Sequence, residues 1–535
     1  MPAYTTPPRL LTEAVRSVLE QTFQDWELVV VDDGSPESLI PIVAAAAAGD
    51  RRIRCARLPS NQGIVGASNQ ALGRARGTFV ALMDHDDLLD GRALARCVAA
   101  LSEEPDCDLL YTDEDWIDME GRSLGPFLKP DWSPERLRGQ NYVNHLCVYR
   151  RTLVEEVGGF RTGFDGSQDY DLLLRASERA RRIVHLPETL YHWRVRPGQV
   201  SGSGNPAVYR AARRAIEEHS QRIGVPGVVE QVDPLGVYRV RRSRSADPLV
   251  SIVIPTRGSS GTVWGTERVF VVEAVRSIVE RSTYANVELV VVADTCMPPP
   301  TEAALRAIAG ERIRLVGYDR PFNYAHKVNL GVLASRGPLV LLLNDDVEVI
   351  SPDWIETMLG LIEYPDVGMV GCALLFEDGT FQHAGHLYLG GGAIGHIGYA
   401  TDGDSPGPIS AFLLERECSG VTAACALLRR SDYLAVGGLT RRLPMNFNDV
   451  DLSLKIRAAG QRIVWTPFAR LYHFESRTRQ VGVGLSELQA VQARWGRVLD
   501  RGDPYWRYPD VSWTVADPSP ALREAALLDE AGVLA

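Results

Sequence analysis

Acidic residues follow short apolar runs at four places in the sequence. Runs such as 26–31 and 338–343 predict buried strands, so the acidic residues after them lie at strand ends. Carboxylates in that position can face one point and hold a hard divalent cation that bridges two phosphates. Asp and Asn also favour turns and helix caps, which is the simpler interpretation of any single cluster. The clusters contain Asp32 and Asp33, Asp84 and Asp86, Asp294, and Asp345 and Asp346.

Two further aspartates, Asp169 and Asp449, each stand at the start of a helical pattern. Such an aspartate can cap the helix, or it can be a general base that deprotonates an acceptor hydroxyl. His192 and His473 follow about two dozen residues later, each in a Leu-Tyr-His tripeptide. A lone histidine is commonly structural, but at equivalent places downstream of carboxylates each can complete a metal shell.

The clusters recur because the chain repeats itself. The segment AVRSVLEQTFQDWELVVVDDGS from Ala14 matches AVRSIVERSTYANVELVVVADTC from Ala274, and later matches keep the same order. Two copies of one fold explain this order. We expect a first domain over residues 1–240, a linker over 241–248, a second domain over 249–510 and a tail over 511–535 that forms a terminal helix.

Each copy alternates strand and helix patterns. Residues 26–31, 78–83, 287–292 and 338–343 predict strands, and residues 10–21 and 270–281 predict helices. This order predicts an α/β fold with mainly parallel sheets, in which ligands bind beyond the carboxyl ends of the strands. The run VSIVIPT opens the second copy, whereas Met1-Pro2-Ala3 lines up with its end. We therefore expect the first strand of copy one to be missing, leaving a core gap, with a truncated start favoured over a compromised copy.

Composition narrows the function classes. A formal net charge of −11 argues against a broad nucleic-acid footprint, so we expect no nucleic-acid partner. The 8 cysteines form no C-x-x-C pair, which favours reduced thiols. No apolar run approaches a membrane span, and the start lacks signal-peptide features. We expect a cytoplasmic protein, with peripheral contact at the inner face of the membrane as an option for a lipid-linked acceptor.

Taken together, these motifs resemble family 2 glycosyltransferases of the GT-A fold, a Rossmann-like nucleotide-diphospho-sugar transferase architecture. The motifs are VSIVIPT, VDDGS, the D-x-D-like clusters, VGGF or VGGL before the acidic pairs, and the late histidines. The resemblance implies a tandem bacterial enzyme that performs an inverting transfer from a nucleoside-diphosphate sugar, assisted by Mg²⁺ or Mn²⁺. The implied acceptor is a hydroxyl of a glycan or lipid-linked glycan in cell-surface polysaccharide synthesis.

The resemblance also implies roles for individual residues. The implied bases are Asp169 and Asp449. The implied nucleotide-sugar contacts are Asp32, Asp33, Asp84, Pro255, Thr256, Asp294, Lys327 and Asp345. The implied metal shell contains Asp86 and His192 in copy one, and Asp346 and His473 in copy two.

Copy two departs from the pattern at two positions. Ala293 stands where copy one has Asp32, and Asn344, a weaker metal ligand, replaces Asp84. Lys327 is expected either to neutralise a phosphate or to be a solvated surface lysine. The histidines of residues 382–396 resemble a metal site, but an acceptor-side mobile loop is preferred.

Two other functions remain open at this point. Only the second domain is catalytic in one alternative, with the first acting as a glycan-binding or scaffolding module. In the other, the chain is a nucleotidyltransferase that makes the sugar nucleotide. The latter needs a glycine-rich phosphate loop after the first strand, and VSIVIPTRGSSG is a poor match to one.

Overall fold

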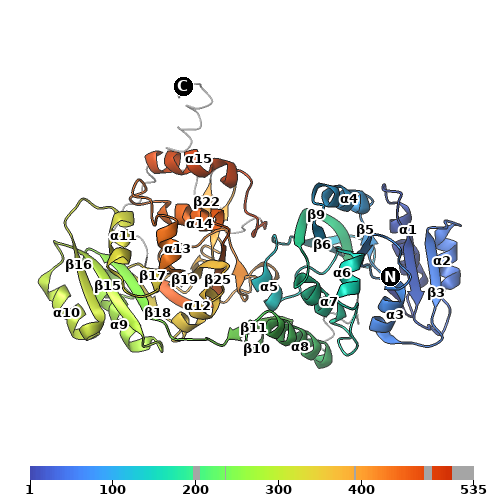
Figure 1. Cartoon of the computed structure of the whole chain (residues 1–535), viewed down its shortest axis with the longest axis horizontal. Helices are drawn as coiled ribbons and strands as arrows, with labels where there is room; N and C mark the ends of the chain where they lie inside the picture. The colour runs from blue at the N-terminus through green and yellow to red at the C-terminus, as the bar shows by residue number, and fades with distance from the viewer. Residues whose placement is uncertain (197–204, 235, 391–392, 475–484, 509–535) are drawn as a thin grey trace, which may run out of the picture. The chain divides into compact units, whose positions relative to one another are not determined.

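The computed structural model describes residues 1–196, 205–234, 236–390, 393–474 and 485–508. The chain divides into two compact units, unit 1 over Met1–Arg241 and unit 2 over Arg242–Ala535 (Figure 1). Of residues 241–248, expected as a linker, the first two complete a strand that ends at Arg242, and the others precede the strand that begins at Val250. The helix expected after residue 510 lies outside the described residues.

Unit 2 is built on one mixed sheet whose first four strands are parallel. Their order is β16 (Ile313–Tyr318), β15 (Val287–Asp294), β12 (Val250–Thr256) and β17 (Leu339–Leu343). The path continues through β24 (Cys425–Arg429), β19 (Val367–Leu375), β25 (Arg462–His473) and β18 (Val347–Val349). β24 runs antiparallel to β17, whereas β19 and β25 are parallel to each other. The predicted α/β class is confirmed.

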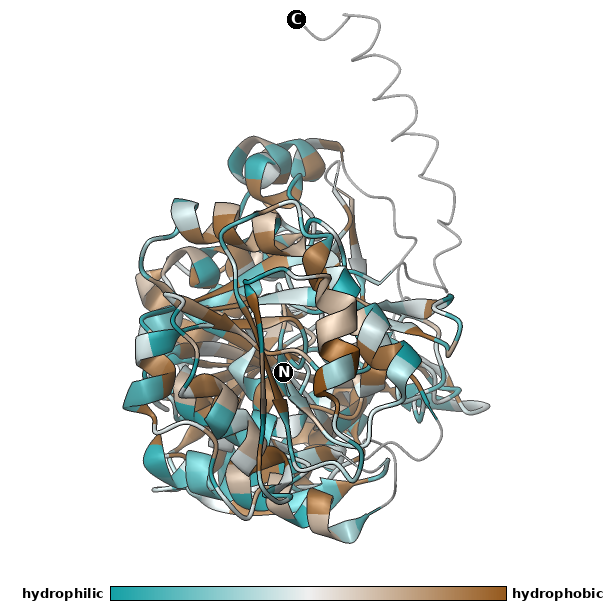
Figure 2. Ribbon diagram, turned by 90° about the vertical axis from the view of Figure 1, so that its right-hand side faces the viewer, coloured by the Kyte–Doolittle hydropathy of each residue, from teal (hydrophilic) through white to brown (hydrophobic). Residues whose placement is uncertain are grey.

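The central strand β12 explains why this sheet is buried on both faces. Ile252 and Ile254 belong to the core cluster that contains residues of α9 (Phe270–Arg281) and α12 (Trp354–Ile362). Val253 belongs to a second cluster that contains residues of α11 (Tyr324–Ala334). Successive side chains of a strand point to opposite faces, so an uninterrupted apolar run is what two helical layers require. Figure 2 shows apolar residues concentrated on the strands and teal, polar residues on the outer helix surfaces.

Unit 2 contains further helices and strands besides these. The helices are α10 (Pro299–Ala309), α13 (Arg430–Ala435), α14 (Asn448–Ala458) and α15 (Leu485–Leu499). The strands are β13 (Ser260–Val263), β14 (Thr266–Val269), β20 (Phe381–His383), β21 (His386–Tyr388), β22 (Ile394–His396) and β23 (Arg416–Glu417).

Unit 1 repeats this strand order but splits it into two sheets. One contains β1 (Pro2–Ala3), β2 (Leu28–Asp32) and β3 (Ile53–Arg57). The other follows the order β4 (Phe79–Ala81), β8 (Cys147–Arg150), β6 (Cys107–Ile117), β9 (Arg182–Arg194) and β5 (Leu88–Leu89), with β7 (Ser123–Phe127) beside β6. The strand that joins the two halves in unit 2 is reduced here to β1, which pairs with β2.

A cavity of about 780 Å³ lies where the two sheets of unit 1 would otherwise join. Leu28 and Val29 of β2 and Phe79 and Val80 of β4 line it. In unit 2 the corresponding edges of β15 and β17 both pair with β12. The first strand of unit 1, β1, is therefore two residues long and does not bridge the two sheets.

Helices cover the two sheets of unit 1. They are α1 (Pro8–Leu19), α2 (Ile40–Ala47), α3 (Gly63–Leu72), α4 (Ala93–Glu103), α5 (Pro134–Gly139), α6 (Arg151–Glu156), α7 (Gln168–Ser177) and α8 (Pro206–Arg222). The hairpin of β10 (Gly227–Val232) and β11 (Val237–Arg242) follows. Across the described parts of both units, no helix has the length and apolar character needed to cross a bilayer.

Candidate active sites

Unit 2 has a cavity of about 510 Å³ beside the carboxyl ends of β12 and β17. The topology of a parallel sheet explains its place, because strand ends and the loops after them meet at one edge. Seven of the predicted site residues line this one cavity: Pro255, Thr256, Lys327, Asp345, Asp346, Asp449 and His473. Segments far apart in the sequence therefore supply a single site.

The metal-competent side of the cavity consists of Asp346 and His473. His473 Nε2 lies 3.2 Å from Asp346 Oδ1 and 3.1 Å from the amide nitrogen of Asn344. The other ring nitrogen, Nδ1, lies 2.6 Å from Gln382 Oε1, which can only accept a hydrogen bond, so Nδ1 donates. Because Nδ1 carries the proton, the Nε2 lone pair faces the Asp346 carboxylate. That is the tautomer a metal ligand needs.

Lys327 is buried, so the expectation of a solvated surface lysine is wrong. Its ammonium lies 2.8 Å from Asp294 Oδ1 and donates to the carbonyl oxygen of Thr256 at 2.8 Å. Thr256 in turn donates from its hydroxyl to Asp345 Oδ2 at 2.6 Å. These contacts tie the ends of β12 and β15 and the loop after β17 into one polar network.

Helix α14 presents its two N-terminal aspartates differently. Asp451 is buried and accepts hydrogen bonds from Thr440 and Trp495, which gives it a structural role. Asp449 lines the cavity instead, and its side chain is 21% exposed. Burial alone raises the pKa of Asp449. Its neighbours, with His386 the strongest of them, together outweigh that effect and hold the pKa well below its ordinary value.

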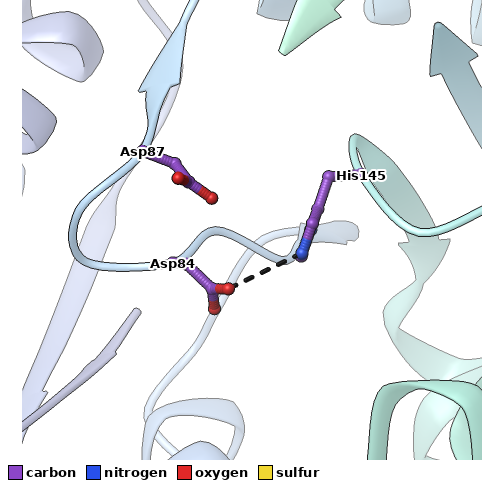
Figure 3. A group of neighbouring side chains, drawn as sticks. All are labelled: Asp84, Asp87 and His145. Atoms are coloured by element: carbon purple, nitrogen blue, oxygen red, sulfur yellow. Dashed lines mark ion pairs between the residues drawn. The ribbon is translucent and has the colours of Figure 1, made fainter. Parts of the chain in front are cut away.

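Unit 1 brings together a different metal-competent group, which consists of Asp84, Asp87 and His145 (Figure 3). One ligand atom from each lies within 4.8 Å of the others, and His145 Nε2 is 3.6 Å from Asp84 Oδ2. Burial and the charges of Asp84 and Asp86 raise the pKa of Asp87 well above its ordinary value. A cation at this point would relieve that repulsion, so the residues fit a divalent metal.

The predicted metal residues of unit 1 have other partners. His192 Nδ1 lies 2.6 Å from Asp115 Oδ1, because β9 places it alongside β6. Asp86 Oδ2 lies 2.5 Å from Arg196. Sequence reasoning missed Asp87 and His145. Asp87 belongs to the same acidic run as Asp84, but only the pairing of β8 with β4 brings the segment of His145 close.

Asp169, the predicted base of unit 1, stands in the first turn of α7. Asn141 Nδ2 lies 3.3 Å from its Oδ2. Burial raises the pKa of Asp169, an effect that His145 opposes and Asp84 reinforces. Its electrostatic surroundings therefore differ from those of Asp449.

Asp32 and Asp33 hold the loop after β2. The two carboxylate oxygens of Asp32 accept hydrogen bonds from the backbone N–H groups of Ser35 and Leu39, at 2.9 and 3.0 Å. Asp33 Oδ1 accepts from the N–H of Gln62 at 2.7 Å. The turn-and-cap alternative thus describes what these side chains do in this structure. Their contact with a nucleotide stays a prediction.

Residues 382–396 form strands β20, β21 and β22 over most of their described length, so the expected loop is wrong. His383 and His386 are each 1% exposed, because the short strands fold against the main sheet. An α/β unit whose strand ends carry carboxylates and a histidine beside a cavity is typical of an enzyme that handles phosphorylated ligands with a divalent cation.

Comparison with known protein families identifies the family of this chain. The family described as "Glycosyl transferase family 2" matches residues 1–158 and 251–437, which is more than half of the chain and falls in both units. The chain belongs to glycosyl transferase family 2. The family match occurs once in each unit.

Two relatives with similar sequences come from bacteria. The chain is 40% identical over 531 residues to an uncharacterized protein y4gI of Sinorhizobium fredii, covering 98% of this chain and 57% of that protein. It is 35% identical over 524 residues to O-antigen biosynthesis protein RfbC of Myxococcus xanthus, covering 96% of this chain and 40% of that protein. The chain therefore spans about half of the length of these relatives.

Among solved structures, residues 1–349 of S. aureus TarS in complex with UDP-GlcNAc match with a TM-score of 0.35 and 24% identity. That match covers 41% of this chain and 64% of the other.

Proposed function

We propose that unit 2 transfers a sugar from a nucleoside-diphosphate sugar to a hydroxyl of a glycan or lipid-linked acceptor, with inversion at the anomeric carbon. The observation that carries the proposal is the single cavity that unites Asp345, Asp346 and His473 with Asp449. Such a transfer requires side chains that bind the diphosphate of the donor and a base that takes the proton of the acceptor hydroxyl.

The diphosphate side of the reaction is assigned to the ends of β12 and β17. Asp346 and His473 would hold Mg²⁺ or Mn²⁺, which supplies positive charge to the departing diphosphate when bound. The fit rests on the His473 tautomer, whose unprotonated Nε2 faces the Asp346 carboxylate. Pro255, Thr256, Asp294 and Asp345 are proposed to line the donor pocket. Lys327 keeps Asp294 and the Thr256 carbonyl in place.

The acceptor side is assigned to Asp449. Its carboxylate takes the proton of the acceptor hydroxyl as that oxygen forms the new bond to the anomeric carbon. The bond from that carbon to the diphosphate oxygen breaks, and the electron pair leaves with the nucleoside diphosphate. Attack opposite the leaving group inverts the configuration. A lowered pKa keeps Asp449 ionised and ready to accept that proton.

We propose that unit 1 is a second domain of the same type, with Asp169 as its base. Asp84, Asp87 and His145 form its metal-competent group, and Asp84, His145 and Asp169 all line the cavity that reaches into the gap between its two sheets. Full turnover by Asp169→Asn would instead favour the alternative in which unit 1 only binds glycan or acts as a scaffold. The proposed boundaries remain 1–240, 241–248 and 249–510. A role in cell-surface polysaccharide synthesis at the cytoplasmic face of the membrane fits the relative named for O-antigen biosynthesis.

The stereochemistry of transfer tests this proposal. The purified chain is incubated with Mn²⁺, a panel of UDP-GlcNAc, UDP-galactose and dTDP-rhamnose, and simple glycoside acceptors. Proton NMR of the product then reads the anomeric coupling constant. Inverted configuration at the transferred sugar is expected. Retained configuration would refute Asp449 as an acceptor base, because a retaining transfer does not proceed by one direct displacement.

A further inference from the structure

Three histidines cluster at the unit 2 cavity near Asp449, and none of them has a role in the proposed transfer. They are His383 of β20, His386 of β21 and His396 of β22. The ring centroids of His383 and His396 are 4.8 Å apart, and those of His386 and His396 are 5.7 Å apart. His386 and His396 line the cavity itself.

Hydrogen bonds fix the protons on two of these rings. The backbone N–H of Thr422 donates to His383 Nε2 at 3.1 Å, so His383 carries its proton on Nδ1. That Nδ1 lies 2.6 Å from His396 Nδ1, which must accept, so His396 carries its proton on Nε2. Burial, reinforced by the neighbouring histidines, holds the pKa of His383 well below its ordinary value and lowers that of His396 to about 4. Both rings are neutral at pH 7.

The third ring, His386, faces the proposed base. Its Nε2 lies 3.7 Å from Asp449 Oδ2. Its Nδ1 is buried with no hydrogen-bond partner among the described residues. A proton on Nδ1 would leave an unpaired buried N–H, which is costly, so the proton belongs on Nε2. Gly420 makes room for this ring, because a Cβ at Gly420 would lie 2.6 Å from His386 Nδ1.

We propose that His386 is a positioning residue for Asp449: its Nε2–H points at Oδ2 and keeps the carboxylate ionised and turned toward the acceptor side. The proposal rests on the proposed function, because it takes Asp449 as the base. Asp449 also receives backbone N–H groups from Ala423 and Val450, at 3.4 and 2.9 Å. The other titratable groups that line the cavity are His396, His473, Asp345, Asp346, Lys327, Arg257 and Tyr324.

The two units of this chain supply an internal comparison. In unit 1 the short strand β7 pairs with the far end of β6. The residues after β7, Leu128 to Ser133, contain no histidine. In unit 2 the corresponding strand is β20, and His386 follows it closely. Burial raises the pKa of Asp169, whereas the neighbours of Asp449 more than offset burial. Each aspartate therefore has a histidine neighbour from a different part of its unit: His386 of β21 lies beside Asp449, and His145 lies near Asp169.

The test uses the full chain with Asp169→Asn, so that only unit 2 turns over. In this background, His386→Phe removes the N–H and His386→Gln retains one. The readout is the pH profile of kcat/KM for hydrolysis of UDP-GlcNAc, UDP-galactose or dTDP-rhamnose with Mn²⁺. We expect the acid limb to move up by about one pH unit or more in His386→Phe and by less in His386→Gln. His326→Gln, a histidine of α11 outside the cavity lining, should leave the limb unchanged.

A second measurement does not depend on turnover. Asp449→Asn should lower the melting temperature at pH 7 when His386 is present, and should lower it less, or raise it, with His386→Phe. The sign follows from linkage: a carboxyl whose folded pKa is lowered stabilises the protein above its unfolded pKa, and this stabilisation is lost as pH falls.

The possible failures are distinguishable. If Asp449→Asn retains turnover, the base assignment in the proposed function fails. If Asp449→Asn is inactive but His386→Phe leaves the acid limb in place, or if the two substitutions are additive in melting temperature, the role of His386 is refuted.

Discussion

Replacing Lys327 with methionine separates the two roles that a lysine at this place can have. The ammonium is buried and lies 2.8 Å from Asp294 Oδ1 and 2.8 Å from the Thr256 carbonyl. Breaking a fully buried ion pair from one side costs about 3–5 kcal/mol, because the partner charge is left unpaired. The Asp294 side chain is 18% exposed, so water recovers part of this and we expect a loss of about 2–3 kcal/mol in the free energy of unfolding.

Differential scanning calorimetry of the full chain measures this loss. A unit of this size melts about 2–4 °C lower for each kcal/mol, so the unit 2 transition should fall by about 5–10 °C in Lys327→Met. Adding Asp294→Asn should recover part of the loss, because the unpaired charge is gone. Arg306→Met, which removes an exposed ion pair with Glu302 on α10, is the matched control and should leave the transition unchanged. An unchanged melting temperature together with lost UDP affinity would refute the reasoning and make Lys327 a free phosphate ligand.

Two further predictions concern the metal site and the gap in unit 1. In a chain that carries Asp84→Asn, Asp346→Asn should abolish the Mn²⁺-dependent binding of UDP to unit 2, measured by isothermal titration calorimetry. Asp404→Asn, which changes an exposed aspartate, should leave this binding intact. Equal loss of UDP binding in both variants would contradict the assignment of Asp346. Placing a copy of residues 249–253 ahead of Met1 should raise the melting temperature of unit 1, because each buried Val or Ile side chain contributes about 1.5–3 kcal/mol before ordering costs are subtracted. The same extension with its apolar positions changed to serine should not, and equal effects would show that the cavity does not accept a strand.

The sequence was sufficient to predict the parallel α/β architecture because both of its signals are local. Apolar runs such as residues 287–292 and the helical pattern of residues 270–281 report burial directly, and β15 and α9 coincide with them. The repeat then carried each assignment from one copy to the other. Pro255, Thr256, Asp345 and Asp346 of the unit 2 site could be predicted because they stand at strand ends, which a parallel sheet brings together.

The residues that were missed depend on pairings that no local pattern contains. His145 reaches Asp84 only because β8 lies beside β4, and His192 turns to Asp115 because β9 lies beside β6. The burial of Lys327 on α11 depends likewise on Asp294, which stands at the end of β15. Polar residues far apart in sequence find their partners through strand order, and strand order was the part that sequence reasoning did not derive.

The most direct test of the central claim, that Asp449 is the base of an active glycosyltransferase site, is donor turnover by the full chain. Hydrolysis of UDP-GlcNAc, UDP-galactose and dTDP-rhamnose with Mn²⁺ is compared among wild type, Asp169→Asn, Asp449→Asn and the double variant. If Asp449 and Asp169 are the bases of the two units, Asp449→Asn should lose the unit 2 share of turnover and Asp169→Asn the remainder. The double variant should be inactive. Full turnover by Asp449→Asn, with nucleotide binding intact, would contradict the claim.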